Sequence, residues 1–285
     1  MSLLKSWKAW SLSLLLFLNL VIWFAPVASE ETDVLSVSFL NIGQGDATLI
    51  TSPTGNQLLI DGGPDGSILR ELPKVMKLTD RTIDVVLATH PDRDHINGLS
   101  DVLDRYRVKT FIHSGVESES NSIDEALLYL VESKKIEQKL ARRGMKIDLG
   151  GGAVAEVLFP DRDPKGMETN DASIVLKLTY GKTCFLFTGD SPVKIERYII
   201  GLEKENLECE VLKAGHHGSR TSTSDEFLHF VKLHIVVISA GLDNTYGHPH
   251  EEVLVRLQAA STTTLVTSQN GTITLQSDGK RILIK

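Results

Sequence analysis

From residue 33 onward, short apolar stretches alternate with segments of helical periodicity. In the first half of this region, apolar runs bounded by Gly- or Pro-containing turns predict strands. They lie at Val34–Leu40, Ala47–Thr51, Gln57–Ile60, Ile83–Thr89 and Thr110–His113. Apolar positions spaced by three and four predict helices between them. These lie at Ile68–Leu78 and Gly98–Tyr106, with a long amphipathic helix at Ile123–Gly144.

The second half continues the same alternation. Strands are predicted at Val154–Phe159, Ser173–Tyr180, Thr183–Thr188, Cys209–Lys213, Ile235–Ser239, Thr263–Thr267, Thr272–Gln276 and Arg281–Ile284. Helices are predicted at Pro192–Gly201, Ser224–Val231 and His250–Ala260. Because no linker or low-complexity tract interrupts the pattern, we expect one domain over residues 33–285. Mixed hairpins and βα units favour an α+β fold in which two sheets pack face to face with helices outside.

The first 29 residues follow a different pattern. Lys5 and Lys8 precede an uncharged, mostly apolar run over residues 9–28, and acidic Glu30 follows. The run is long for a signal peptide and just long enough to span a bilayer, so both a signal peptide and an N-terminal membrane anchor stay open. In both cases we expect the remainder of the chain outside the cytoplasm, because positive charge stays inside.

Charge and cysteine content narrow the function classes. The net charge of −7 excludes a protein that coats nucleic acid through a broad basic surface, although a nuclease with few local contacts stays open. The two cysteines, Cys184 and Cys209, show no zinc-finger spacing. We expect them to be free and buried, and the alternative is a disulfide between neighbouring strands in an oxidising compartment.

The densest group of chemically active residues follows the predicted strand Ile83–Thr89. His90, Asp92, Asp94 and His95 fall within six residues. Imidazole nitrogens and carboxylate oxygens in such a loop suit zinc, manganese or iron. A polar surface loop is the alternative interpretation, but the position at a strand end favours a metal site.

Further histidines and acids also follow predicted strands. Adjacent His216 and His217 lie in a glycine-bounded loop, and His248 lies in a loop after the next strand. Asp61 and Asp190 each stand beside glycine at the end of an apolar strand. A single acid next to glycine is weak evidence, since such pairs serve turns everywhere. Two of them in register with the histidines strengthen the prediction of a metal site.

Taken together, these motifs resemble the metallo-β-lactamase superfamily, and more closely the hydrolase-like domain of the ComEC DNA-uptake channel proteins. The segments that carry the resemblance are Asn41–Ala47, Thr89–Leu99, Asn170–Leu176, Phe185–Asp190, Leu212–Ser219 and Ser239–Pro249. The similarity spans nearly all of Val34–Lys285. It implies a four-layer αββα sandwich with a dinuclear metal site along one edge. The long channel region of the ComEC proteins has no counterpart here, so the resemblance does not extend to DNA transport.

The resemblance also implies metal ligands. His90 and Asp92 would hold the first divalent ion, Asp94 and His95 the second, and Asp190 would bridge the two. Asp92 stands where most of the superfamily has a histidine, which makes the first site harder and favours Mn²⁺ over Zn²⁺. A second departure concerns the usual third histidine of the first site. That place is taken by Asn170, so we expect the first ion to be weakly held or absent.

The last histidine ligand is ambiguous between His216 and His248, and we favour His216. His217 or His248 would then contact substrate or protonate the leaving group. Two divalent ions, Zn²⁺ or Mn²⁺, would lower the pKa of a bridging water. Asp94 would orient that water.

For a phosphodiester substrate, basic and polar side chains would surround the phosphate. Arg93 is a candidate to neutralise its charge, and further candidate contacts are Lys213, Ser219, Arg220 and Asn244. The sequence therefore predicts an extracytoplasmic metal-dependent hydrolase, and the resemblance implies a phosphodiesterase or nuclease acting on DNA. A hydrolase of a small ester, lactone or lactam and a non-catalytic envelope binding protein remain alternatives.

Overall fold

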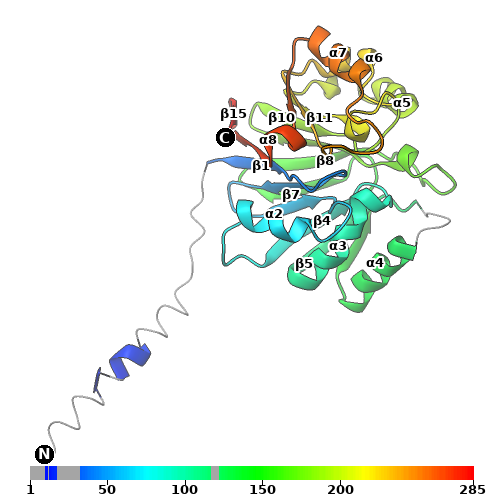
Figure 1. The fold of residues 1–285 in the computed structure, drawn as a ribbon. Helices are drawn as coiled ribbons and strands as arrows, with labels where there is room; N and C mark the ends of the chain where they lie inside the picture. Colours follow the sequence, from blue (N-terminus) through cyan, green and yellow to red (C-terminus); the bar gives the residue numbers. More distant parts are fainter. Residues whose placement is uncertain (1–9, 12, 18–32, 117–121) are drawn as a thin grey trace, which may run out of the picture. The chain divides into compact units, whose positions relative to one another are not determined.

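The computed structural model describes residues 10–11, 13–17, 33–116 and 122–285 (Figure 1). The chain divides into two units, Met1–Glu31 and Thr32–Lys285. Most of the predicted N-terminal segment over residues 9–28 lies outside the described residues. No helix within the described ranges combines the length and apolarity that crossing a membrane requires.

Two sheets form the larger unit. In spatial order, the first contains β15 (Ile282–Ile284), β14 (Ile273–Ser277), β1 (Leu35–Phe39), β2 (Thr48–Thr51), β3 (Gln57–Ile60), β4 (Thr82–Ala88), β5 (Arg107–His113) and β6 (Glu137–Leu140). The second contains β13 (Thr263–Val266), β12 (Ile235–Ile238), β11 (Val211–Lys213), β10 (Thr183–Phe187), β9 (Val175–Tyr180), β8 (Ala153–Phe159) and β7 (Lys146–Gly150). Strands β3 to β6 and β10 to β13 run parallel within their sheets, which places their carboxyl ends at one edge of each.

Helices cover the outer face of each sheet (Figure 1). The first sheet carries α2 (Ile68–Val75), α3 (Arg93–Arg105) and α4 (Ser122–Ser133), and the second carries α5 (Val193–Glu203), α6 (Asp225–Val231) and α7 (Glu251–Ala259). A short helix, α8 (Thr267–Asn270), and 3₁₀ turns η1 (Asn170–Ala172), η2 (Lys204–Leu207) and η3 (Gly215–Gly218) complete the elements. The expected αββα sandwich is confirmed.

Side-chain alternation along the strands explains the layers. On β10, Phe185 and Phe187 enter the core between the sheets, whereas Cys184 and Leu186 pack under the helices of the second sheet. Because both faces of this strand are buried, its sequence is a continuous apolar run without polar alternation. The same arrangement holds for β4, where Leu87 faces the inner core and its neighbours face α3.

Two helix predictions need correction. The helix predicted at Gly98–Tyr106 begins earlier, at Arg93, so that Asp94 and His95 lie in its first turn. The long helix predicted at Ile123–Gly144 is correct only as far as Ser133, the end of α4, because the chain turns at Lys135 with φ +56° and then forms β6 as an edge strand beside β5. All four side chains of β6 are exposed, so the strand lacks the alternation that would reveal it in the sequence.

The expectation of free cysteines is also wrong. Cys184 and Cys209 form a disulfide that links the start of β10 to the segment before β11. These strands are parallel neighbours, with Phe185 opposite Val211. The alternative of a disulfide between neighbouring strands is therefore confirmed, and both cysteines are buried as expected.

Candidate metal centre

The predicted site residues meet at the edge of the sandwich where both sheets end. His90 follows β4, Asp190 follows β10, and the two histidines of η3 follow β11. Backbone hydrogen bonds join the loops: Ile174 N donates to Thr89 O (3.0 Å) and His216 N donates to Gly189 O (3.1 Å). The loops of the two sheets are thus connected directly at the site.

Close backbone approaches set the position of α3. The β1–β2 loop reaches α3 at Gly45, where an added Cβ would lie 2.2 Å from Asp94 O. At Gly98, within the helix, an added Cβ would lie 2.1 Å from Gly62 O. Since no larger residue fits at either place, these glycines allow the first turn of α3 to lie against the loops that carry Asp46 and Asp61.

Four imidazoles surround one carboxylate, that of Asp190. Their Nε2 atoms approach its oxygens to 3.3 Å for His95, 3.5 Å for His217, 3.6 Å for His216 and 4.0 Å for His90. His90, His95 and His217 are fully buried, and the His216 side chain is 27% exposed. Asp190 is therefore the centre of the cluster.

The other ring nitrogen of each imidazole is held by the protein. Nδ1 lies near Thr89 Oγ1 for His90 (3.0 Å), Asp61 Oδ2 for His95 (2.8 Å), Thr221 Oγ1 for His216 (3.2 Å) and the Ser239 carbonyl for His217 (3.0 Å). A hydrogen bond at Nδ1 fixes the ring and leaves the Nε2 lone pair for a metal. Asp61 is itself fixed, because Thr89 donates to it from both its backbone N (2.8 Å) and its hydroxyl (2.7 Å).

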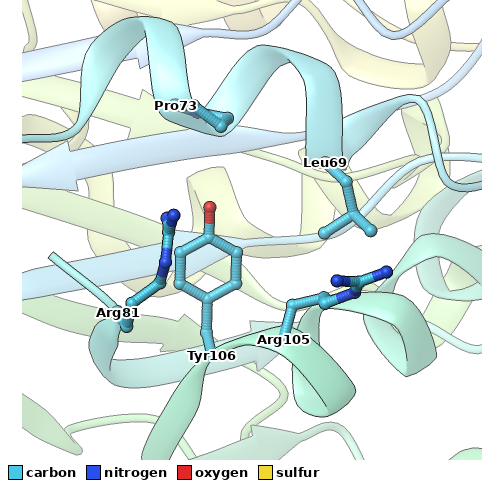
Figure 2. A pocket seen from close by; sticks show the side chains of 5 residues that line it. All are labelled: Leu69, Pro73, Arg81, Arg105 and Tyr106. Atoms are coloured by element: carbon cyan, nitrogen blue, oxygen red, sulfur yellow. The ribbon is translucent and has the colours of Figure 1, made fainter. Parts of the chain in front are cut away.

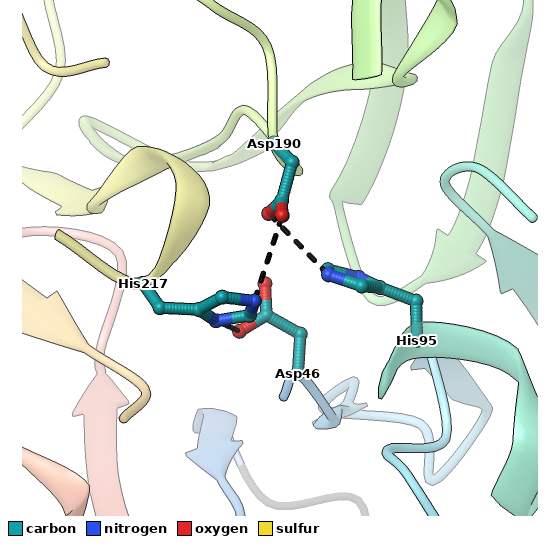
Figure 3. Close-up of side chains that lie close together, drawn as sticks. All are labelled: Asp46, His95, Asp190 and His217. Atoms are coloured by element: carbon teal, nitrogen blue, oxygen red, sulfur yellow. Dashed lines mark ion pairs between the residues drawn. The ribbon is translucent and has the colours of Figure 1, made fainter. Parts of the chain in front are cut away.

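Asp46 completes the most compact group. One ligand atom from each of Asp46, His95, Asp190 and His217 lies within 4.8 Å of the others, and all four residues are buried (Figure 3). Asp46 Oδ1 lies 3.2 Å from His217 Nδ1, and Asp46 Oδ2 forms an ion pair with Lys213. Lys213 is 3% exposed, so its ammonium group neutralises Asp46 behind the cluster.

Several buried atoms of this group have no hydrogen-bond partner in the described part of the chain. They are Nε2 of His90, His95 and His217, Oδ1 of Asp190, Oδ1 of Asp46 and Oδ1 of Asn170. Leaving such atoms unsatisfied is costly, whereas a divalent cation would satisfy several at once. Imidazole nitrogen with carboxylate oxygen is a ligand set suited to Zn²⁺ or Mn²⁺. The residues present therefore fit a metal centre.

The charges of the cluster stabilise one another. Burial raises the pKa of Asp190, but His217 and His95 more than offset this and hold it well below its usual range. Burial lowers the pKa of His217, but Asp190 and Asp46 overcome that effect and raise it to about 9. At His90 burial dominates, and its pKa falls to about 4. Asp190 is thus anionic at neutral pH, as a bridging ligand must be.

The remaining predicted ligands border this group. Asp92 Oδ2 lies 3.7 Å from His90 Nε2, and Asp94 Oδ2 lies 3.2 Å from His217 Nε2. Burial raises the pKa of Asp92. Burial also acts to raise the pKa of Asp94, but the contact with His217 outweighs it and lowers the value to about 2. Asn170 begins η1 with its buried Oδ1 unsatisfied by the described residues.

Most of the predicted substrate contacts lie on the second-sheet side, whereas Arg93 is the first residue of α3 on the first-sheet side. The His248 ring is 5.6 Å from that of His216, and Asn244 holds the His248 loop by accepting from His248 N (2.9 Å). Ser219 is buried and its hydroxyl lies 3.0 Å from Thr221 Oγ1. His248, Asn244 and Ser219 therefore lie around the cluster in addition to the candidate metal ligands.

Arg220 lies at the rim of the site. Its side chain is 62% exposed, and its guanidinium lies 3.9 Å from Glu252. The Arg220 backbone N donates to His250 Nδ1 (3.1 Å). The side chain is therefore largely in solvent.

Sequence reasoning did not assign Asp46 to the cluster. The residue lies in the polar loop Asn41–Ala47, which the sequence marks only as flexible and polar. A signal was present, since the loop is one of the segments that carry the resemblance. Asp46 is held near the cluster by a tertiary contact, in which its backbone N donates to Asp94 O of α3 (3.2 Å).

A cluster of imidazoles and carboxylates at one edge of an αββα sandwich defines a metallohydrolase-like class of protein. The family model of the metallo-beta-lactamase superfamily matches residues 40–241. The chain belongs to this superfamily, whose members are generally metal-dependent hydrolases.

Curated relatives add the closer resemblance. The chain is 31% identical over 271 residues to ComE operon protein 3 of Bacillus subtilis (strain 168), covering 89% of this chain and 34% of the relative. It is 28% identical over 250 residues to competence protein ComA of Neisseria gonorrhoeae, covering 88% of this chain and 33% of the relative. The resemblance to competence proteins of the ComEC type is confirmed, and the chain spans about a third of the length of these relatives.

A solved structure agrees on the fold. CmlA, a diiron beta-hydroxylase from Streptomyces venezuelae, superimposes with a TM-score of 0.54 at 13% identity. The match covers 88% of this chain and 54% of CmlA. At this identity the comparison supports the fold alone.

Proposed function

We propose that this protein is an extracytoplasmic, metal-dependent phosphodiesterase that cleaves DNA. The observation that carries the proposal is the convergence of four Nε2 atoms on the Asp190 carboxylate, each from a ring whose Nδ1 is already held. The relatives named as competence proteins favour nucleic acid as the substrate. The acidic net charge requires that contacts to DNA be few and local to the site.

The chain offers ligands for two divalent ions, Zn²⁺ or Mn²⁺. We assign His90 and Asp92 to one ion, Asp94 and His95 to the other, and Asp190 to both. His216 and His217 are further candidates, because their Nε2 atoms lie 3.6 Å and 3.5 Å from Asp190 Oδ2. When bound, the ions would supply activated water and polarise the bond under attack.

Protein side chains would orient the reacting groups. The Asp94 side chain is one-third exposed and faces both the cluster and solvent, which suits it to accept a hydrogen bond from the attacking water. Asp61 holds the His95 ring through Nδ1 and thereby positions its Nε2. Lys213 is buried against Asp46, so we assign it a positioning role through His217.

His248 and Tyr246 are placed to contact the substrate. Burial and the neighbouring histidines His217 and His216 lower the pKa of His248 to about 4, so the ring is neutral at pH 7 and offers hydrogen bonds to a phosphate oxygen. Tyr246 stacks on His248 with ring centroids 5.6 Å apart, and Tyr246 is 66% exposed. An exposed aromatic ring beside the cluster suits stacking with a nucleobase.

The remaining predicted contacts fit a phosphate near η3. Ser219 and the exposed Arg220 follow the two histidines of this turn, and Asn244 fixes the loop that presents His248. We therefore keep Ser219, Arg220 and Asn244 as substrate-side residues. A group that protonates the leaving group must carry a proton at neutral pH. Of the two candidates from the sequence, His217 meets this condition with its pKa raised to about 9, whereas His248 is neutral and is suited to hydrogen-bond the substrate.

The disulfide supports the proposed location. Disulfides persist in oxidising compartments and are rare in the cytosol. The Cys184–Cys209 bond therefore favours a site of action beyond the cytoplasmic membrane. Secretion and membrane attachment through residues 9–28 both agree with this location.

One experiment separates the candidate functions. The purified protein is incubated with Mn²⁺ or Zn²⁺ and assayed on single-stranded DNA, on a chromogenic phosphodiester, and on a chromogenic ester and lactam. We expect cleavage of DNA and of the phosphodiester, lost on chelation and in Asp94→Ala. As a matched control, Asp163→Asn changes an aspartate that is 73% exposed, and it should retain full activity.

Two outcomes would overturn the proposal. Cleavage of the ester or lactam without cleavage of either phosphodiester would identify a small-molecule hydrolase. Absence of any metal-dependent cleavage, together with a metal content near zero, would identify a binding protein that uses the sandwich as a scaffold.

A further inference from the structure

A second polar pocket lies away from the metal cluster, between α2 and the end of α3. It has a volume of about 360 Å³ and is lined by Leu69, Pro73, Arg81, Arg105 and Tyr106 (Figure 2). Figure 2 shows the Tyr106 ring between the two arginines, with its hydroxyl directed towards α2. Leu69 and Pro73 of α2 form the apolar side. The pocket thus joins two guanidinium groups, a phenol hydroxyl and an apolar wall.

The polar groups of this pocket form no ion pair or side-chain hydrogen bond with the part of the chain that the structure describes. Among the described residues, neither guanidinium forms an ion pair or side-chain hydrogen bond, and the Tyr106 hydroxyl makes no hydrogen bond. Tyr106 is only 6% exposed, so this hydroxyl belongs to a side chain that is more than nine-tenths buried. Arg81 lies against the ring at 5.9 Å from its centroid. The Tyr106 ring is buried while its hydroxyl is open to the pocket, and the two exposed guanidiniums beside it are unpaired among the described residues; this arrangement suits an anion.

A second arginine–tyrosine contact in the same protein includes an acidic partner that the pocket of Arg81 and Tyr106 lacks among the described residues. The Arg162 guanidinium lies 4.8 Å from the centroid of Tyr198. At that place Asp161 accepts from both, from Arg162 Nε (3.0 Å) and from the Tyr198 hydroxyl (2.7 Å). No acidic side chain lines the pocket of Arg81 and Tyr106 within the described chain. A ligand anion would occupy the role that Asp161 has at the other pair.

The surroundings of the pocket are also basic. A neighbouring hollow of about 440 Å³ shares Arg81, Arg105 and Tyr106 and adds Arg107 and Lys134, against one acid, Asp104. Asp104 is paired with Lys134 at 3.0 Å. In a chain of net charge −7, this local excess of positive charge favours an anionic ligand over a cationic or neutral one.

We propose that the pocket formed by Arg81, Arg105 and Tyr106 binds a phosphate group of a nucleotide. Two planar guanidiniums and a hydroxyl match the several oxygens of a phosphate. The apolar wall of Leu69 and Pro73 suits the flat, less polar remainder of a nucleotide better than a bare ion. The choice of a nucleotide as the source of the phosphate rests on the proposed function, whereas anion binding does not.

The pocket is separate from the metal cluster. Helix α3 has 13 residues, and it carries Asp94 and His95 in its first turn and Arg105 in its last. At 1.5 Å per residue, the two ends lie roughly 20 Å apart. A strand of nucleic acid held at this pocket would therefore have a second point of attachment, distant from the bond that is cut.

Binding by the full-length protein tests the proposal. The probes are thymidine 5′-monophosphate, thymidine and inorganic phosphate, titrated by calorimetry at fixed low ionic strength. We expect the monophosphate to bind and thymidine not to bind. In Arg81→Ala with Arg105→Ala, affinity should fall about 100-fold, and in Tyr106→Phe about tenfold, as for lost hydrogen bonds to charged groups. The exposed arginines can be replaced without disturbing the core.

Control variants separate this pocket from the metal centre. Arg162→Ala removes the matched arginine at the other tyrosine and should leave the affinity within about twofold, since surface charges far from a site contribute little. Asp190→Asn should keep this binding even though it is expected to abolish catalysis. The proposed binding at this pocket can therefore be tested independently of the nuclease activity.

Three results would overturn the proposal. The first is equal binding of the monophosphate by the wild type and by the double arginine variant. The second is binding of inorganic phosphate alone, which would make the site a simple anion site. The third is binding of vesicles of anionic phospholipid, lost in the double arginine variant, without binding of the nucleotide.

Discussion

The two ends of α3 carry side chains of opposite charge. Its first turn carries Asp94 and His95 beside Asp92, facing a cluster that suits metal cations. Its last turn carries Arg105, followed by Tyr106, in a pocket whose lining includes no acidic side chain among the described residues. The helix dipole favours negative charge at the first end and positive charge at the second. The backbone therefore stabilises the acidic side chains at the first end and the basic side chain at the second, and these side chains, not the dipole, would attract a cation and an anion respectively.

The largest expected effect is at the first end. Asp190→Asn keeps the shape of the side chain but removes the charge that four imidazoles face. We expect phosphodiesterase activity to fall by more than about 100-fold, beyond the range typical of outer-shell changes at metal sites. Cleavage assays and elemental analysis measure this. Retained activity and metal content would show that the cluster is not the centre, while binding at the Arg105 end should not change.

The disulfide between Cys184 and Cys209 lies in the second sheet, so its contribution to stability is separate from both ends of α3. Replacing Cys184 and Cys209 by serine opens a link between residues 25 apart in sequence, and we expect a loss of roughly 3 kcal/mol in the free energy of unfolding. Denaturant unfolding of the oxidised protein and the double variant measures the difference. Cys184→Ser alone should behave like the double variant. An unchanged midpoint would show that the bond does not stabilise the fold.

A smaller effect is expected where Asp61 orients His95. Asp61→Asn replaces one of the two acceptor oxygens by an NH₂ donor, so the side chain can no longer accept from Thr89 N at one oxygen and from Thr89 Oγ1 and His95 Nδ1 at the other. Loss of such a partner reduces metal affinity or activity by about 10- to 100-fold. Titration with Mn²⁺ followed by activity measures it, with Asp101→Asn on the exposed side of α3 as the control. An unchanged metal dependence would contradict the positioning role of Asp61.

The smallest expected effect concerns the exposed ring beside the cluster. Tyr246→Ala removes the surface proposed to stack with a base and should weaken DNA binding by about 1 kcal/mol, the lower end of the range for base stacking. Tyr246→Phe keeps the ring and should retain the affinity. Tyr129→Ala on α4 changes an equally exposed tyrosine and serves as a second control. Equal losses in all three variants would argue against a specific stacking role.

Local sequence patterns identified the candidate residues around the first turn of α3, although the helix itself begins five residues earlier than predicted. His90, Asp92, Asp94 and His95 are adjacent in sequence, so a single loop reveals them. Asp46 was not assigned, because it reaches the cluster through a tertiary contact. Its backbone N, in the loop between β1 and β2, donates to Asp94 O in α3, and a local sequence pattern does not reveal such a contact.

Dependence on contacts between distant segments also explains the errors at β6 and at the cysteines. The edge strand β6 exposes all of its side chains, so the apolar positions Ile136 and Leu140 fitted a helical pattern instead. Pairing of Cys184 with Cys209 depends on β10 and β11 being neighbours, which is a property of the sheet order. The pocket at the second end of α3 combines residues from three separate segments, and the sequence contains no motif for it.

Metal content tests the central claim most directly. The purified protein, dialysed against metal-free buffer after loading with Mn²⁺ or Zn²⁺, is analysed for bound metal beside Asp190→Asn. The account predicts bound divalent metal in the wild-type protein, up to two ions per chain, and little in the variant. Equal metal content in both proteins, or none in either, would contradict it.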